Sequence, residues 1–207
     1  MLLLLLLSAC RPPTPAGDAA LGRGEVLLAH TNDLHAHFLP TAAPWLPGSP
    51  ELGGFVAIDA HLSALRASAG ELVYLDGGDL LSGTPLMELE ERGVAGGAML
   101  SFLEAAGCDG WVVGNHELDR GIDHAQRFVA ASEVAVLTAN LRDPSGQRPL
   151  LDGTVARRII DHNGLRIGVF GLTTDAMSGL TSRETAAALS VVPLAEAARE
   201  QVSEREG

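Results

Sequence analysis

Three short clusters in this chain combine carboxylate, imidazole and amide side chains that suit divalent metal ions. The clusters are Asp33-Leu34-His35, Gly77-Gly78-Asp79 and Gly114-Asn115-His116-Glu117. Carboxylate and imidazole groups together hold Zn, Mn or Fe. Two such ions held about 3.5–4 Å apart clamp a phosphoryl group and activate a water molecule between them. The clusters therefore predict chemistry on a phosphate ester.

Four residues of these clusters are candidate metal ligands. Asp33 and His35 lie two positions apart after an apolar run, so in an extended segment their side chains would point to the same side. Asp79 follows two glycines that permit a tight turn, and its short carboxylate could bridge two ions. Asn115 offers a neutral amide oxygen. Taken singly, each cluster could equally be a helix cap or a turn.

His116 and Asp119 form a candidate pair for proton transfer. The imidazole of His116 could protonate a leaving alkoxide. Asp119 follows three residues later, close enough to accept the second ring proton and fix the tautomer. The neighbouring Glu117 is expected to have no required role, and Arg120 could either contact a phosphate or pair with Asp123.

The remaining histidines and the second cysteine are expected to be structural or solvated. His30 falls inside an apolar run and is expected to pack within a strand. Cys108 is expected to be a small buried hydrophobic residue. Solvated positions are expected for His61, His124 and His162.

The clusters need strands to position them, and each one follows an apolar run. Strands are expected at residues 25–31, 71–75 and 110–113. Their ends would bring the three clusters to one edge of a sheet, where open α/β folds place their sites.

Further along the chain, helices and strands alternate. Apolar residues at helical spacing predict helices at 54–69, 94–106, 122–131 and from 193 onward. A fourth strand is expected at 134–139, and an Asn-Gly pair predicts a hairpin between 155–160 and 165–170. The alternation predicts an α/β fold with a mainly parallel sheet and flanking helices.

Composition limits the class of protein and its partners. The chain has 207 residues, of which 46% are hydrophobic, enough for one domain with a core. It carries 14 Lys and Arg against 26 Asp and Glu, a net charge of −12 that argues against a nucleic-acid polymer as partner. If Cys10 is lipidated or removed, Cys108 is the one remaining thiol, so no internal disulfide is expected.

The first ten residues are expected to be an export signal. The apolar run from Leu2 to Leu7 is too short to span a bilayer, which takes about 20 residues. The segment Leu7-Ser8-Ala9-Cys10 resembles the bacterial lipobox, which predicts lipid attachment at Cys10 and an exported, periplasmic or membrane-anchored protein. No Lys or Arg precedes the run, so the start could lie upstream, or Cys10 could be an ordinary leader cysteine. Residues 11–24 are expected to form a flexible tether.

Taken together and in order, the clusters resemble those of the calcineurin-like metallophosphatases. The resemblance is strongest to the exported bacterial 5′-nucleotidase and 2′,3′-cyclic-nucleotide phosphodiesterase branch, and it runs from residue 25 to the C-terminus. The motifs that carry it are Thr31-Asn32-Asp33-Leu34-His35, Asp76-Gly77-Gly78-Asp79 and Gly114-Asn115-His116-Glu117-Leu118-Asp119, with support from residues 29–35, 77–84 and 168–174.

The resemblance implies a fold, a reaction and a role for each matching residue. Residues 25–207 would be the N-terminal part of a four-layer αββα sandwich, and the reaction would be nucleotide phosphomonoester hydrolysis by a water that two metal ions activate. Asp33 and His35 would bind the first ion, Asp79 would bridge both, and Asn115 would bind the second. The dyad that assists phosphoryl transfer would be His116 with Asp119.

The sequence also departs from the family pattern. Family members supply further histidine ligands from a Thr-His-x-Gly segment and a Gly-His segment, and neither occurs in these 207 residues. The separate C-terminal domain that grips the nucleoside in the family is not expected within residues 25–207 either. The alternative expectation is therefore a truncated, non-catalytic surface lipoprotein or gene fragment that retains part of the metal site. An uncovered sheet face is also expected, and with it self-association of the isolated chain.

Overall fold

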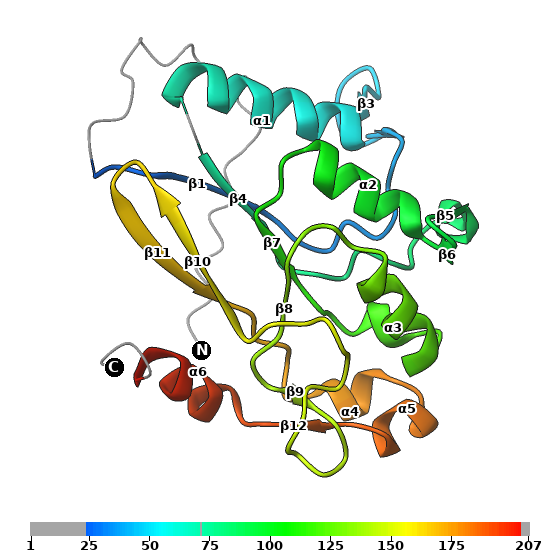
Figure 1. The fold of residues 1–207 in the computed structure, drawn as a ribbon. Helices are drawn as coiled ribbons and strands as arrows, with labels where there is room; N and C mark the ends of the chain where they lie inside the picture. Colours follow the sequence, from blue (N-terminus) through cyan, green and yellow to red (C-terminus); the bar gives the residue numbers. More distant parts are fainter. Residues whose placement is uncertain (1–23, 71, 204–207) are drawn as a thin grey trace.

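A four-stranded parallel sheet with the order β1-β4-β7-β8 forms the centre of the chain (Figure 1). The computed structural model describes residues 24–70 and 72–203. Its central strands are β1 (Leu27–Thr31), β4 (Leu72–Asp76), β7 (Gly110–Val112) and β8 (Val136–Leu137). The expected export signal with Cys10, and all of the expected tether except residue 24, lie outside the described residues.

Three helices connect these strands in turn, as the sequence pattern predicts. They are α1 (Phe55–Ala69), α2 (Gly97–Ala105) and α3 (Ile122–Ala130). β4 and β7 are central and largely buried, whereas β1 is an edge strand whose residues alternate between partly buried and exposed. The predicted α/β architecture with flanking helices is confirmed. None of the helices in the described ranges is long and apolar enough to cross a membrane.

Aromatic side chains join the helices to one another and to the sheet. Phe55 of α1 stacks on Phe102 of α2, with ring centroids 3.8 Å apart. Phe128 of α3 meets Trp111 of β7 edge to face at 5.7 Å. Trp111 is fully buried, and its indole N–H donates to Ser132 Oγ at 3.0 Å. The core therefore lies between the parallel sheet and the three helices, and its packing holds the strands whose ends carry the three clusters.

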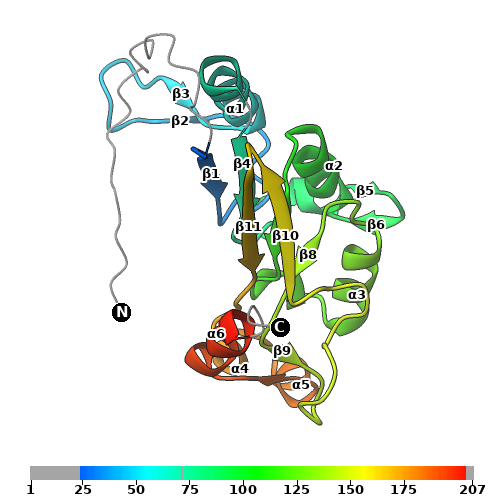
Figure 2. The same cartoon turned by 60° about the vertical axis from the view of Figure 1, so that its left-hand side comes forward.

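An antiparallel hairpin packs on the other side of the sheet. Its strands are β10 (Arg157–His162) and β11 (Leu165–Phe170), and Figures 1 and 2 place it on the side away from α1, α2 and α3. Asn163 and Gly164 form the two-residue turn, with φ values of 48° and 80°. The hairpin that the Asn-Gly pair predicts is therefore confirmed. β10 ends two residues later than expected, because a two-residue turn pairs His162 directly with Leu165.

Short elements complete the described chain. The two-stranded pairs are β2 (Thr41–Ala42) with β3 (Glu51–Leu52), β5 (Glu90–Glu91) with β6 (Val94–Ala95), and β9 (Leu141–Arg142) with β12 (Ser190–Val191). The short helices are η1 (Pro85–Glu88), η2 (His116–Leu118), α4 (Met177–Leu180) and α5 (Arg183–Ala187), and α6 (Leu194–Ser203) follows them.

Three histidines differ from their expected environments. His30 is exposed, because β1 is an edge strand and His30 lies on its open face. His124 is buried on the inner side of α3, where its Nε2 donates to the Ala95 carbonyl at 3.2 Å. His162 is buried because it shares the inward face of β10 with Ile160, two residues earlier.

Candidate active site

The loop after β1 carries the first cluster in an unusual backbone conformation. Asp33, His35 and Ala36 are left-handed, with φ values of 54°, 46° and 50°. Their backbone N–H groups donate to the carbonyls of residues 78–80 at 2.9–3.0 Å. The expectation that a strand pleat aligns Asp33 with His35 is therefore wrong. The loop after β4 fixes the loop after β1 through backbone hydrogen bonds, and this pairing sets the positions of both side chains.

His35 is oriented by both of its ring nitrogens. Nδ1 lies 3.1 Å from the Leu81 carbonyl oxygen. Because a carbonyl oxygen only accepts, Nδ1 is the ring nitrogen that donates in this hydrogen bond. Nε2 then faces Asp33, at 3.5 Å from Oδ1. A carbonyl that holds one ring N–H is the usual way to present the other nitrogen to a metal ion. The His35 ring also meets the His116 ring edge to face, with centroids 4.8 Å apart.

Two glycines allow the loops after β4 and β7 to touch. A Cβ on Gly78 would lie 2.3 Å from the Val112 carbonyl oxygen, and a Cβ on Gly114 would lie 2.3 Å from Asp79 Oδ1. Asp79 itself is left-handed, with φ 55°, and its Oδ1 accepts from the His116 N–H at 2.9 Å. Close backbone approach therefore brings Asp79 against the cluster that contains Asn115.

Asp76, at the end of β4, is a buried carboxylate beneath these loops. Its Oδ2 accepts from Thr31 Oγ1 at 2.5 Å, and its Oδ1 accepts from the Gly78 N–H at 2.8 Å. Burial raises the pKa of Asp76 to about 6, and the charges of Asp33 and Asp79 act in the same direction. Asp76 thus ties the loop after β4 to β1.

Glu117 is the residue that the sequence interpretation missed. Its side chain is only 1% exposed, and its carboxylate accepts four backbone N–H groups, from Asp79, Leu80, Leu81 and Gly114. Burial raises the pKa of Glu117 to about 7, and the charge of Asp79 acts in the same direction. The sequence interpretation did not anticipate this burial or these hydrogen bonds. Residue type and spacing do not distinguish a solvated loop glutamate from one that binds backbone N–H groups.

His116 and Asp119 lie together at the rim of the loops. His116 Nδ1 lies 2.7 Å from Asp119 Oδ2, and the same oxygen accepts from Ser82 Oγ at 2.7 Å. Burial acts to lower the pKa of His116, but the hydrogen bond and charge of Asp119, with the charges of Asp79 and Glu117, leave it above its ordinary value. The sequence interpretation included Ser82 only within the supporting segment 77–84 and did not single it out, because a loop serine is common.

The candidate ligands come from three loops and have the donor types of a divalent transition-metal site. Asn115 is partly buried, and its side-chain amide makes no hydrogen bond to the described part of the chain. Asp33 accepts a hydrogen bond from the Asn32 amide, and Asp79 accepts one from a backbone N–H. Within residues 24–70 and 72–203, no group of three or more His, Cys, Asp or Glu side chains is arranged to hold an ion. The donor chemistry of the four candidate ligands fits a divalent metal ion.

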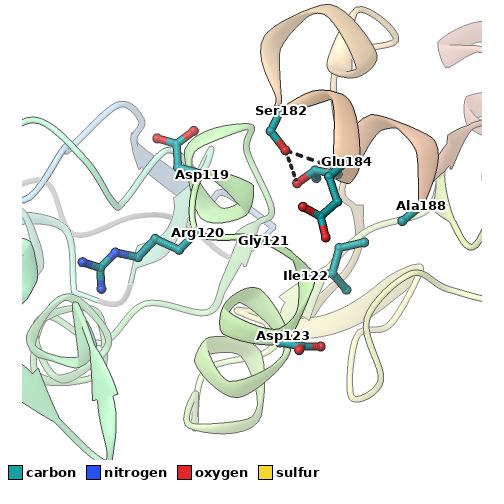
Figure 3. A pocket seen from close by; sticks show the side chains of 9 residues that line it. Asp119, Arg120, Gly121, Ile122, Asp123, Ser182, Glu184 and Ala188 are labelled. Carbon is teal, nitrogen blue, oxygen red and sulfur yellow. Dashed lines mark hydrogen bonds between the residues drawn. The ribbon is translucent and has the colours of Figure 1, made fainter.

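A groove of about 490 Å³ begins at Asp119 and runs between the start of α3 and α5 (Figure 3). Three of its nine lining residues are acidic: Asp119, Asp123 and Glu184. Arg120 points away from α5 in Figure 3 and pairs with Glu88 of η1. The structure therefore pairs Arg120 with a carboxylate that the sequence interpretation did not consider.

Comparison with known proteins gives several relatives that are named 5′-nucleotidases. No protein-family model matches the chain. The chain is 33% identical over 161 residues to the probable 5′-nucleotidase of Treponema pallidum (strain Nichols), across 76% of this chain and 26% of that protein. It is similar to the 5′-nucleotidase precursor from Thermus thermophilus, with a TM-score of 0.73 and 28% identity over 86% of this chain and 34% of that one.

The fold is also found in a protein of lower identity. The calcineurin-like phosphoesterase YfkN from Bacillus subtilis gives a TM-score of 0.67 at 19% identity, over 87% of this chain and 58% of that one. The chain spans 26% to 35% of the length of four curated relatives. The resemblance seen in the sequence motifs is confirmed: the chain belongs to the calcineurin-like metallophosphatase superfamily, in which it corresponds to the N-terminal part of the catalytic domain.

Proposed function

We propose that this chain takes part in the metal-dependent hydrolysis of nucleotide phosphomonoesters. The observation that supports this best is the meeting of the loops after β1, β4 and β7 beside the hydrogen-bonded pair His116 and Asp119. Similar proteins named 5′-nucleotidases support the nucleotide as substrate class.

In this proposal four side chains from the three loops hold two divalent ions of the Zn, Mn or Fe type: Asp33, His35, Asp79 and Asn115. Asp79 has the central place, because its backbone and carboxylate contact both neighbouring loops. When bound, such ions neutralise the charge of the phosphoryl group and make water a stronger nucleophile at neutral pH. His35 presents Nε2 because Leu81 holds its Nδ1.

His116 supplies the proton for the leaving alkoxide. Asp119 accepts from Nδ1, so Nε2 is the nitrogen that faces the substrate. Its raised pKa increases the fraction of imidazolium that can donate a proton near neutral pH. Asp119 positions the ring and stabilises its charged form, and it does not itself contact the substrate.

The proposal includes the export and domain assignments made from the sequence. Residues 1–10 would be a lipoprotein-type signal peptide, with lipid attachment at Cys10, and residues 11–24 a tether. Residues 25–207 would belong to the metallophosphatase domain, in the periplasm or anchored to a membrane.

A second candidate is a surface lipoprotein that binds at most one metal ion and hydrolyses nothing. This candidate is favoured by the arrangement of the candidate ligands, because no three His, Cys, Asp or Glu side chains converge in the ranges that the structure describes. It differs from the first proposal in one measurable property, the release of phosphate.

The test is Mn²⁺-dependent phosphate release from AMP by the purified chain. We expect release by the wild type and by Asp59→Ala, which alters an exposed carboxylate of α1, and none by Asp79→Ala. Thermal unfolding of the three proteins checks that they are folded. Absence of release from the folded wild type would exclude the enzymatic proposal and support the second candidate. Equal release from Asp79→Ala would also exclude the proposed site, because the hydrolysis would then not depend on Asp79.

A further inference from the structure

We propose that Glu117 is the positioning residue that sets the spacing between the loop bearing Asp79 and the loop bearing Asn115, so that both are ready to receive a metal ion. This inference rests on the metal-binding part of the proposed function. It assigns a role to a side chain that would contact neither metal nor substrate.

The hydrogen bonds of Glu117 divide between the two loops. From the loop after β4, the N–H of Asp79 donates to Oε2 at 3.1 Å, and those of Leu80 and Leu81 donate to Oε1 at 2.8 and 3.2 Å. From the loop after β7, the N–H of Gly114 donates to Oε2 at 2.7 Å. One carboxylate therefore joins the residue before Asn115 to Asp79 itself.

Close packing makes these hydrogen bonds hard to replace. Glu117 is 1% exposed, so water does not substitute easily for its carboxylate. A Cβ on Gly78 would lie 2.3 Å from the Val112 carbonyl oxygen and one on Gly114 would lie 2.6 Å from the Asp79 nitrogen, so the two loops already touch beside these hydrogen bonds. Buried N–H groups that lose their acceptor destabilise the conformation that buries them. The loops would then move apart.

The carboxylate is required for its chemistry as well as its size. Both oxygens of Glu117 face only backbone N–H groups, and this arrangement suits the ionised carboxylate, which accepts hydrogen bonds and donates none. An amide of the same shape has one accepting oxygen and one donating nitrogen. In either orientation, Glu117→Gln would turn an NH2 group toward two backbone N–H groups. The substitution should therefore disturb the loop spacing without creating a cavity.

The experiment is a titration of the metal-free chain with Co²⁺ alone. Calorimetry measures the affinity, and visible absorption reports the ligands around the ion. We expect Glu117→Gln to bind Co²⁺ about 10- to 100-fold more weakly than the wild type. Leu103→Ala, which removes a buried side chain of α2, is the control for lost stability. It should lower the melting temperature and leave the affinity for Co²⁺ unchanged.

The outcomes separate the two proposals. Equal Co²⁺ affinity of the wild type and folded Glu117→Gln would overturn the role of Glu117 while the metal site stands. Absence of Co²⁺ binding by the wild type would overturn the metal site, and the role of Glu117 with it. A loss of affinity in Leu103→Ala as large as in Glu117→Gln would show a general effect of stability and would also overturn the inference.

A second measurement decides the question if Glu117→Gln does not fold. In the wild type, amide hydrogen exchange of Asp79, Leu80, Leu81 and Gly114 should already be slow in the metal-free protein, and Zn²⁺ should slow it little further. Exchange that becomes slow only after Zn²⁺ is added would show that the metal, rather than Glu117, sets the loop spacing.

Discussion

Asp119 Oδ2 accepts two hydrogen bonds, one from the ring of His116 and one from the hydroxyl of Ser82. Ser82 is itself left-handed, with φ 69°, and directly follows Leu81, whose carbonyl holds His35. The same loop thus orients one candidate metal ligand and the carboxylate behind the candidate acid. A serine hydroxyl that fixes one oxygen of Asp119 restricts the directions in which that oxygen accepts from His116.

We predict that Ser82→Ala lowers AMP hydrolysis about fivefold, because one hydrogen bond contributes roughly 1 kcal/mol to the position of Asp119. The melting temperature should change little, since the hydrogen bond is exposed. Ser68→Ala, which removes a hydroxyl bonded to its own helix, is the matched control. Unchanged initial rates of phosphate release in Ser82→Ala would show that His116 holds Asp119 without help.

His124 gives a prediction about pH, away from the candidate ligands. Burial lowers the pKa of His124, and the charges of Arg120 and Arg127 act in the same direction, while the Ala95 carbonyl and Glu88 oppose it. The unfolded chain therefore takes up this proton near pH 6.5, whereas the folded chain resists it. The contribution of His124 to the free energy of unfolding is present above about pH 6.5 and is lost as the pH falls below it.

Urea denaturation at about pH 7 and about pH 5.5 checks this sign. The free energy of unfolding of the wild type should fall more between these values than that of His124→Gln, which has no ring to protonate. The comparison with the variant removes the contributions of the other titrating groups, which both proteins share. Equal falls in the two proteins would mean that His124 takes up its proton in the folded state as easily as in the unfolded chain.

At the scale of elements, local signals predicted the hairpin and the helices well. Two-residue turns with positive φ at both positions favour Asn-Gly, and Asn163 and Gly164 have these angles. The loop after β1 could not be predicted in the same way. Its left-handed Asp33 and His35 are held by carbonyls more than 40 residues later in the chain, and no neighbour in the sequence indicates them. Local pattern thus gave the strand ends, and the loop conformations depend on tertiary contacts.

We predict that Gly164→Ala destabilises the chain by about 1 kcal/mol or more, because its φ of 80° is costly for a residue with a Cβ. The matched control is Gly179→Ala in α4, where φ is ordinary and a new Cβ would meet no atom within 4 Å. That change should be neutral or slightly stabilising. Urea denaturation of both variants measures the difference, and equal effects would show that the turn does not fix the hairpin.

At the scale of the whole molecule, several of the exposed apolar side chains fall in one segment between β1 and α1. We call residues 39–52 the apolar excursion. It includes Leu39 and Trp45, which are 66% and 73% exposed. Val56 at the start of α1 lies close to it in the sequence and is 83% exposed. Single exposed apolar residues are normal in soluble proteins, but several in one segment favour association.

We therefore predict that the chain self-associates as its concentration rises. Gel filtration with light scattering should show a mass that increases with concentration in the wild type and falls toward that of the monomer in the double variant Leu39→Ser with Trp45→Ser. Glu51→Ser, an exposed change in the same excursion, should behave as the wild type. A constant monomer mass for the wild type would contradict the prediction.

In the candidate site, as in the elements, some residues could be predicted from the sequence and others could not. The candidates chosen from residue type and order, since strand ends in a parallel sheet meet at one edge, are Asp33, His35, Asp79, Asn115, His116 and Asp119. Glu117 and Ser82 were not found. Their contribution is made through hydrogen bonds to other loops, which depend on how β4 and β7 lie side by side.

The central sheet has one further property, because its strands lie in space in the same order as in the sequence. A chain that emerges from its N-terminus can add β4 to β1, then β7 to β4 and β8 to β7, without leaving a gap for a later strand. Each new strand can form its hydrogen bonds with the strand that is already present. Synthesis from the N-terminus delivers the strands in this same order. The nascent chain would thus hold Asp33 and His35 in place once β4 has docked, and would gain Asn115 only with the arrival of β7.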